Sequence, residues 1–442
     1  MLWSECLLQC ARPGCALLLM TVLLVFPAQA PAYSVLTHEE IIDLAWNDSI
    51  RPLLLSRYPG TSEAALEEAH AYAYGGSAIQ DMGYYPFGKE FFSDLTHYVR
   101  TGDFVASLFR NAGNVNELAF AIGALSHYLG DNIGHTECIN PATAVEFSRL
   151  AKKYGESVTY DQNPHAHVRT EFAFDIAQLH DHRLAPAAYL HFIGLRVPRH
   201  LVEKSFYETY GLPLHEVLGP ERPAMKSYRT SVRNFIPRFA HAEVVLHGGG
   251  MPADVDDEAF RHFEQQVRQA PFQRWNATRH RAGIETHLLA ALIFILPRIG
   301  PLSDLAIRGP NKQTEQWYIR SVNDTMAEFR QILSAVQQGR ESSIVLNNRD
   351  LDTGDPIQPG AYPLTDKTYA VLLRKVTSDP GGEVPQSLRH DLLKFYSDPN
   401  APIITKKDHD AWKQVQRELA ALRRMPPARK LPSEGVFAAG RE

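Results

Sequence analysis

Cysteine is scarce in this chain, and most of it lies at one end. Of four cysteines in 442 residues, Cys6, Cys10 and Cys15 lie near the N-terminus, and only Cys138 lies beyond residue 32. Without those first residues the chain cannot close an internal disulfide. A protein that works outside the cytoplasm without disulfides needs a large core or a bound metal for its stability.

Long apolar runs are also rare. The longest, residues 16–26, is shorter than the roughly 20 residues that span a bilayer. Small-residue cleavage patterns follow it and end at Ala30 and at Ala32. This order predicts a signal peptide over residues 1–32 and a periplasmic or extracellular protein. Arg12 is the only cation before the run, which is weak for a signal peptide. An uncleaved anchor therefore stays open as the lesser alternative.

A surplus of positive charge is missing, and so is the period-two alternation of strands. The formal net charge is −5, so we expect no stable nucleic-acid partner. Apolar residues recur instead at helical spacing, which predicts an all-α fold. Helices are expected over residues 62–74, 114–136, 166–180, 284–298, 314–338, 364–376, 386–396 and 408–424.

Local signals mark the ends of these helices. Thr37 and Glu40 have the spacing of a capping box, with Thr37 as the N-cap of the first helix. The pair Gly75–Gly76 predicts a turn, and the polar residues 347–363 predict a linker between helices. A break at Gly248–Gly250 separates the N-terminal part from a helical C-terminal region, residues 251–442, to which no role is assigned.

Histidine is what the chain has in excess, with nineteen copies. His127, Asp131 and His135 are four residues apart, so in a helix they form one stripe. Burying three such side chains in an otherwise apolar segment is costly without partners. A polar helix face with satisfied histidines is the structural alternative. Imidazole and carboxylate are also zinc ligands, and a metal site is the functional interpretation.

Further residues of the same types lie on either side. His167 and Glu171 repeat the spacing of four, Asp81 and His97 precede the stripe, and His38 lies in the first turn of the first predicted helix. A single pair of this kind is more often an ordinary ion pair or core contact. The ordered series of histidines and carboxylates is what indicates a metal centre.

The stretch His-Tyr-Leu-Gly-Asp at residues 127–131 resembles the His-Tyr-x-Gly-Asp signature of the zinc-dependent phospholipase C family, which is related to fungal single-strand-specific nucleases. The resemblance is strongest over residues 33–200. It implies a multi-helix phospholipase C/nuclease-like bundle with three zinc ions, here over residues 33–250. In that family the α-amine and carbonyl of the mature N-terminal residue ligate one ion, five positions before the first histidine. Five positions before His38 is Tyr33, which cleavage after Ala32 would expose.

The resemblance also implies the metal ligands residue by residue. One zinc would be surrounded by Asp81, His97, His127 and Asp131. A second would be held by Tyr33 and His38, with Asp131 bridging the pair, and a third by His135, His167 and Glu171.

One spacing departs from the family. There the next histidine follows the signature aspartate by six residues, with a proline between, whereas His135 follows Asp131 by four. Glu137 is at the family's position, and the softer ligand Cys138 is adjacent. The third ion could therefore be held through His135 or Glu137, or be absent, so two zinc ions are expected and the third is to be tested.

The resemblance implies a phosphodiester hydrolase that uses a metal-activated water, with Asp81 as the catalytic carboxylate. Phospholipase C cleavage of a phospholipid is the first interpretation, and it allows contact with a membrane surface. A single-strand nuclease or 3′-nucleotidase on the same metals is the alternative. A non-catalytic, metal-stabilised envelope protein is a third. The absence of a basic surplus favours lipid over nucleic acid.

Overall fold

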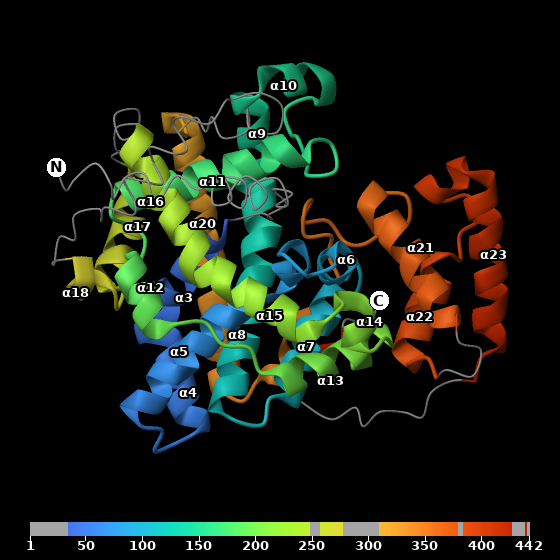
Figure 1. Cartoon of the computed structure of the whole chain (residues 1–442), viewed down its shortest axis with the longest axis horizontal. Coiled ribbons are helices and arrows are strands. Elements are labelled where there is room, and N and C mark those ends of the chain that lie inside the picture. Colours follow the sequence, from blue (N-terminus) through green and yellow to red (C-terminus); the bar gives the residue numbers. More distant parts are fainter. Residues whose placement is uncertain (1–33, 248–256, 277–308, 379–382, 427–437, 440–442) are drawn as a thin grey trace, which may run out of the picture.

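The computed structural model describes residues 34–247, 257–276, 309–378, 383–426 and 438–439, and helices dominate these ranges (Figure 1). The predicted all-α fold is confirmed. The helices up to residue 180 are α3 (Val35–Ala45), α4 (Arg51–Arg57), α5 (Glu63–Ser77), α6 (Glu90–Tyr98), α7 (Thr101–Asn111), α8 (Val115–Gly134), α9 (Asn140–Glu146), α10 (Ser148–Tyr154) and α11 (Pro164–His180). The later ones are α12 (Ala187–Ile193), α13 (Arg199–Tyr210), α14 (Leu214–Leu218), α15 (Glu221–Thr230), α16 (Ile236–His247), α17 (Glu258–Gln269), α18 (Gln273–Asn276), α20 (Lys312–Gln337), α21 (Pro363–Thr377), α22 (Gln386–Phe395) and α23 (His409–Arg424).

Short irregular turns connect these helices. The π-helical turns are η1 (Trp46–Ile50), η3 (His135–Ile139) and η4 (Ser231–Phe235), and the 3-10 turns are η2 (Ile79–Tyr84), η6 (Glu341–Ser343) and η7 (Ile404–Lys407). Strand within the described ranges is limited to a parallel pair, β1 (Val345–Leu346) with β2 (Ala438–Ala439). No helix in those ranges is both long and apolar enough to cross a membrane.

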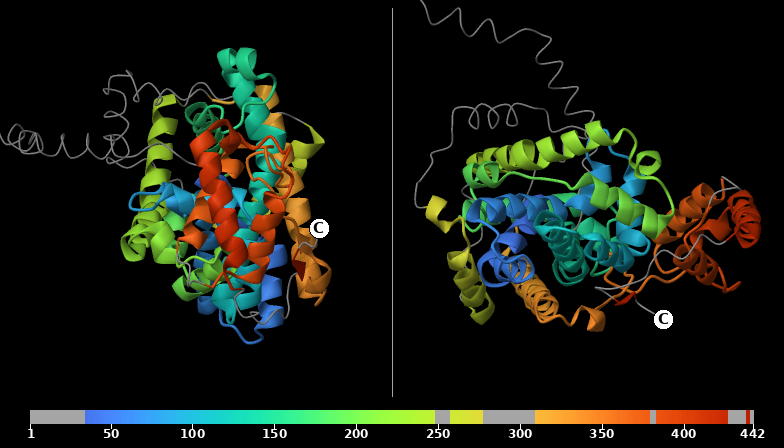
Figure 2. Two further views of the ribbon diagram at one scale, coloured as in Figure 1. Left: turned by 90° about the vertical axis from the view of Figure 1, so that its right-hand side faces the viewer. Right: turned by 90° about the horizontal axis from the view of Figure 1, so that it is seen from below.

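Helix α8 is the central element of the fold. Every residue from 118 to 131 is buried, as expected for a helix whose apolar residues surround it rather than forming one stripe. Helices α5 and α8 lie in a middle layer, with α15 and α16 on one side and α20 on the other (Figure 2). The elements α21, α22 and α23 pack together at one end of the molecule (Figure 1).

The glycine pair at 75–76 is not a turn, so that prediction is wrong. Both residues lie inside α5. A Cβ atom at Gly76 would overlap the Phe120 carbonyl, and one at Gly123 would overlap the Ala73 carbonyl. Gly76 and Gly123 therefore allow α5 and α8 to cross closely. This crossing places the end of α5 beside the candidate ligands of α8.

The start of the first helix also differs from prediction. Helix α3 begins at Val35 after the N-cap Ser34, and Thr37 lies within it. No capping box forms, because Asp175 of α11 accepts hydrogen bonds from the Leu36 and Thr37 amides, both 3.1 Å, and from the Thr37 hydroxyl at 2.7 Å. A carboxylate from a distant helix satisfies the first turn in place of a local cap.

The remaining predictions concern the C-terminal half. Helix α20 packs along α8 and α3, and its bounds and those of α21, α22 and α23 lie close to the predicted ranges. The predicted helix at 284–298 and the break at Gly248–Gly250 lie outside the described residues, so the boundary between 33–250 and 251–442 stays a prediction. The predicted linker at 347–363 instead packs into the interior, where Leu351 and Asp352 are buried.

Candidate metal centre

The structure gathers eight of the nine predicted ligands in its interior, and the ninth, Tyr33, lies outside the described residues. All eight are buried. They form two groups, which we call the paired centre and the third centre. The paired centre is His38, Asp81, His97, His127 and Asp131, and the third centre is His135, His167 and Glu171.

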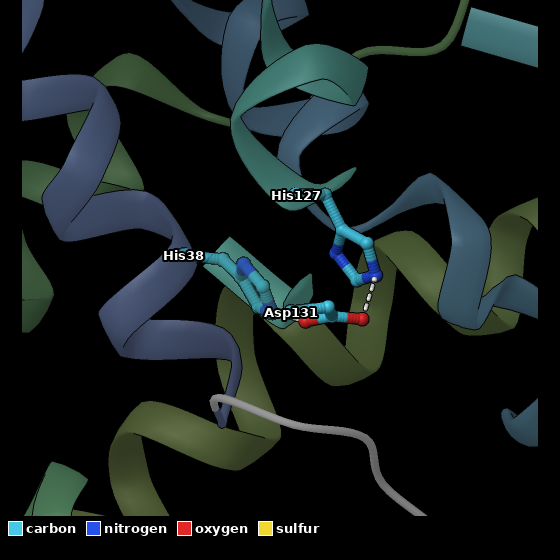
Figure 3. A group of neighbouring side chains, drawn as sticks. All are labelled: His38, His127 and Asp131. Carbon is cyan, nitrogen blue, oxygen red and sulfur yellow. Dashed lines mark ion pairs between the residues drawn. The ribbon is translucent and has the colours of Figure 1, made fainter. Parts of the chain in front are cut away.

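The paired centre is organised around Asp131. Its Oδ1 atom lies 3.3 Å from His38 Nε2, and its Oδ2 atom lies 3.0 Å from His127 Nε2 and 3.4 Å from His97 Nε2. Figure 3 shows the imidazoles of His38 and His127, from α3 and α8, converging on this carboxylate. Asp81 Oδ1 approaches His97 at 3.3 Å and His127 at 3.6 Å. Because the two oxygens of Asp131 face different histidines, the carboxylate is placed to bridge two ions.

The third centre lies where α11 meets the end of α8. His167 Nδ1 is 2.6 Å from Glu171 Oε1, and His135 Nε2 is 3.9 Å from the same oxygen. The two imidazole rings are 4.9 Å apart between centroids. Their facing nitrogens and the carboxylate can therefore supply three ligand atoms to one ion.

Hydrogen bonds fix two histidines of the paired centre, His97 and His127, in a ligating form. His127 Nδ1 donates to the Ser77 carbonyl at 2.9 Å, and His97 Nδ1 donates to the Ser93 carbonyl at 2.7 Å. A carbonyl oxygen can only accept, so the proton of each neutral ring is on Nδ1 and the lone pair of Nε2 faces the centre. This arrangement is typical of metal-ligating histidines. The close crossing of α5 and α8 is what brings Ser77 to His127.

The histidines of the third centre are held in the same way by other partners. His135 Nδ1 donates to the Leu351 carbonyl at 2.5 Å. His167 Nε2 donates to the side-chain oxygen of Asn140 at 2.8 Å. The Asn140 amide nitrogen in turn donates to the Asp352 carbonyl at 2.7 Å, which fixes the orientation of that side chain. The lone pairs of His135 Nε2 and His167 Nδ1 therefore face Glu171.

The carboxylates of both centres have no hydrogen-bond donor among the described residues. Within the described ranges, neither oxygen of Asp81, Asp131 or Glu171 receives a hydrogen bond. Burial raises the pKa of Glu171 to about 8. Burial would also raise the pKa of Asp131, but the neighbouring histidines, first of all His127, hold it well below its ordinary value. Buried carboxylates without donors are costly unless a cation compensates them, so these residues fit bound metal ions.

Of the alternative ligands His135, Glu137 and Cys138, the structure places His135 in the third centre. His135 lies in the group with His167 and Glu171, whereas Glu137 is exposed and lies near Asp324. Cys138 is buried, and burial raises the pKa of its thiol well above its ordinary value, which disfavours a thiolate ligand.

The π-helical turn η3 brings Asn140 beside His135. It follows α8 directly, and the Asn140 amide donates to the His135 carbonyl, five residues back. Such a turn is wider by one residue than an α-helical turn. Residues five apart then lie near one another on one face, so both His135 and Asn140 reach His167.

Three residues that hold the third centre were missed by sequence reasoning. Asn140 carries no signal of its own, and Leu351 and Asp352 contribute backbone carbonyls, which every residue type has. Only the acidic and polar character of the 347–363 segment set it apart, and that character predicted a linker.

A comparison with known families agrees with this geometry. The model of the zinc dependent phospholipase C family matches residues 37–219. This part of the chain is similar to the zinc-dependent phospholipase C family. Comparisons with curated proteins and with solved structures give no match.

All eight described ligands lie inside the matched range, whereas Leu351 and Asp352 lie outside it. The similarity to a zinc-dependent family, together with the buried histidines and carboxylates of the paired centre and the third centre, supports zinc as the metal.

Proposed function

We propose that this chain is an exported phosphodiester hydrolase of the phospholipase C type that acts on phospholipids. The observation that carries the proposal is the paired centre, where Asp131 faces histidines on both sides and Asp81 points into the same group. Two bound ions with a shared carboxylate are typical of enzymes that displace a leaving group from phosphorus.

The chain's residues would divide the work. When bound, zinc ions at these centres would polarise the phosphoryl oxygens, acidify a water molecule and stabilise the leaving alkoxide. Asp81 is buried, and its oxygens receive no hydrogen bond from the described residues. It is therefore placed to ligate, and to orient or deprotonate the attacking water. His135, His167 and Glu171 would hold the ion on the leaving-group side.

Aromatic side chains span the two centres on one side. The ring of Tyr84 lies 5.9 Å from that of His97, and the ring of Tyr160 lies 5.8 Å from that of His167. The two tyrosine rings are 6.5 Å apart. Tyr84 is partly exposed, so this pair lies between the metals and solvent.

The charges near this pair are mostly negative. The carboxylates of Asp352 and Glu90 lie near the tyrosine pair. Asp94 is also near, but burial raises its pKa to about 7, so it is only partly ionised at neutral pH. The nearby cation Lys367 is 3.3 Å from Asp161 and is partly neutralised by it. Acidic side chains around aromatic rings suit a cationic head group better than a polyanion. This favours a zwitterionic phospholipid over single-stranded nucleic acid.

Export is part of the proposal because it would create the ninth ligand. The described chain begins at the buried residue Ser34, directly after Tyr33, and helix α3 carries His38 into the paired centre. Cleavage after Ala32 would leave the α-amine of Tyr33 five positions before His38. N-terminal sequencing of the secreted protein tests this, and a different first residue would remove Tyr33 from the ligand set.

Product analysis tests the reaction. The mature protein is expected to release phosphocholine from phosphatidylcholine vesicles and no nucleotides from single-stranded DNA. The Asp81→Asn variant, which keeps an oxygen ligand but removes a base, is expected to lose about 10²–10⁴-fold in kcat. Nucleotide release would favour the nuclease alternative. Neither product, with zinc still bound, would favour a metal-stabilised protein without catalysis.

A further inference from the structure

Residues 347–362, which we call the C-terminal loop, lie against both centres although the family match ends at residue 219. The peptide groups of Leu351 make the contact. Its amide donates to the His97 carbonyl at 3.0 Å, and its carbonyl accepts from His135 Nδ1 at 2.5 Å. Leu351 is completely buried. One residue of the C-terminal loop thus touches a ligand of each centre.

The next residue reaches the third centre by two routes. The Asp352 carbonyl holds Asn140, and Asn140 holds His167. The Asp352 carboxylate accepts from the hydroxyls of Tyr98 at 3.0 Å and Tyr362 at 2.5 Å, and its Oδ1 atom lies 3.9 Å from His135 Nδ1. Both histidines of the third centre are therefore oriented through this loop.

The conformation of the loop is itself fixed by contacts. Asp350 Oδ1 accepts from the amides of Asp352 at 3.1 Å and Thr353 at 3.2 Å, and Asp350 Oδ2 accepts from the Thr365 hydroxyl at 2.5 Å. Gly354 has a φ of +71°, and a Cβ atom there would overlap the side chain of Thr136 in η3 and approach the Asn132 carbonyl of α8. A glycine is thus needed both for the backbone conformation and for the close approach.

We propose that the C-terminal loop positions the third centre, so that zinc binding by His135, His167 and Glu171 requires residues outside the family-matched segment. This inference rests on the proposed function, which assigns an ion to that centre. A metal-ligating histidine loses affinity when the acceptor of its second N–H is removed, typically by about 10–100-fold. The paired centre has its own acceptors, the Ser77 and Ser93 carbonyls, within the matched segment.

Two variants of the full mature protein test the inference. Gly354→Ala displaces the loop from α8, and its matched control is Gly339→Ala, where φ is +70° but no atom lies within 4 Å of the added Cβ. Asn140→Leu removes the acceptor for His167. Its control is Asn111→Leu, whose amide bonds Glu208 of α13 instead. Zinc content is measured by titration with a chromogenic chelator, and metal-free folding by circular dichroism.

The expected result is selective loss of one zinc. In Gly354→Ala and Asn140→Leu one ion should dissociate about 10–100-fold more readily, with the others and the metal-free fold unchanged. Both controls should bind zinc as the wild type does. Wild-type affinity at all sites in both variants would overturn the inference and leave the proposed function standing. A wild type that binds only two ions would overturn the three-ion assignment itself.

A second measurement uses the wild type and does not depend on how the variants fold. Binding energies are reciprocal, so occupancy of the third centre should stabilise the loop. Hydrogen exchange of the loop amides, including the buried Leu351 amide, should slow when zinc is restored to the chelated protein. Exchange in the C-terminal loop that is indifferent to zinc would overturn the inference.

Discussion

The paired centre and the third centre use the same ligand types but are supported differently. The ligands of the paired centre and the acceptors that orient His97 and His127 all lie in the segment that matches the family. The third centre has its ligands in that segment, but the acceptor of His135 is Leu351, more than two hundred residues further along the chain. A family match can thus contain every ligand of a site and still omit part of what holds it.

The two centres also differ in how their charges are balanced. In the paired centre, Asp131 lies among three histidines that keep its pKa well below its ordinary value despite its burial. In the third centre, burial raises the pKa of Glu171 to about 8 and lowers the pKa of His167 to about 4. The raised pKa favours the protonated form of Glu171 at neutral pH, so ionisation of this carboxyl group depends on a bound cation.

The largest effect should come from the residue that joins the paired ions. Asp131→Ala removes the shared carboxylate and is expected to lower kcat/KM by about 10³-fold or more, because several kcal/mol of transition-state stabilisation depend on both ions. Zinc analysis should show loss from the paired centre with one ion retained at the third. Loss of all the zinc would show that the two centres do not bind metal independently.

A substitution in the third centre should leave the paired centre intact. His135→Ala is expected to release one zinc, leave the paired ions in place and reduce kcat less than Asp131→Ala does. Glu137→Ala is the matched control, two residues away and exposed. Zinc content and kcat measured for both variants show whether His135 or Glu137 ligates the third ion. Loss of zinc in Glu137→Ala alone would reverse the assignment.

The pH dependence of zinc binding should reflect both centres. Although burial lowers it, the carboxylates of Asp131 and Asp81 raise the pKa of His97 well above its ordinary value. The raised pKa values of His97 and Glu171 favour their protonated forms, so zinc binding must displace protons there, whereas His167 with its pKa of about 4 has none to lose at pH 7. Acidification therefore favours the metal-free form.

Two measurements test whether acidification releases zinc. Zinc binding at pH 7 should release protons, which calorimetry in buffers of different ionisation enthalpy detects. Activity and zinc content should fall together below about pH 5–6. Full activity with zinc retained at pH 4 would contradict the prediction.

The smallest effect should come from the side chains that span the two centres. Tyr84→Leu is expected to raise KM for phosphatidylcholine by roughly 2–30-fold, which corresponds to about 0.5–2 kcal/mol of a cation–aromatic contact. The KM for an anionic phospholipid should change less. Tyr207→Leu on the surface of α13 is the control. An equal change with both lipids would remove Tyr84 from head-group recognition.

Much of this molecule was predictable from its sequence. Periodic apolar residues located α5, α8, α11 and α20 to within a few residues, because burial imposes a 3.6-residue repeat on helices. The spacing of four placed His127 and Asp131 on one face of α8, and they lie 3.0 Å apart. Side-chain identity and helical geometry were sufficient for these features.

What was missed depends on tertiary contact. The pair Gly75–Gly76 predicts a turn, and only the crossing of α8 at Gly76 shows why glycine is needed inside a helix. The first turn of α3 is capped by Asp175 from another helix. The C-terminal loop acts largely through backbone carbonyl groups, and because every residue has one, the sequence does not indicate them. Tyr33 as a ligand stays a prediction.

The π-helical turn after α8 has a consequence for how this region can change over evolution. It amounts to one extra residue held within a continuous helix, between His135 and Asn140. Removing that residue would restore a regular α-helix in which Asn140 follows His135 by four positions, which again places both on one face. The π-helical turn therefore absorbs one residue without turning Asn140 away from His167. The length of this segment is thus under looser constraint than the identity of Asn140 itself.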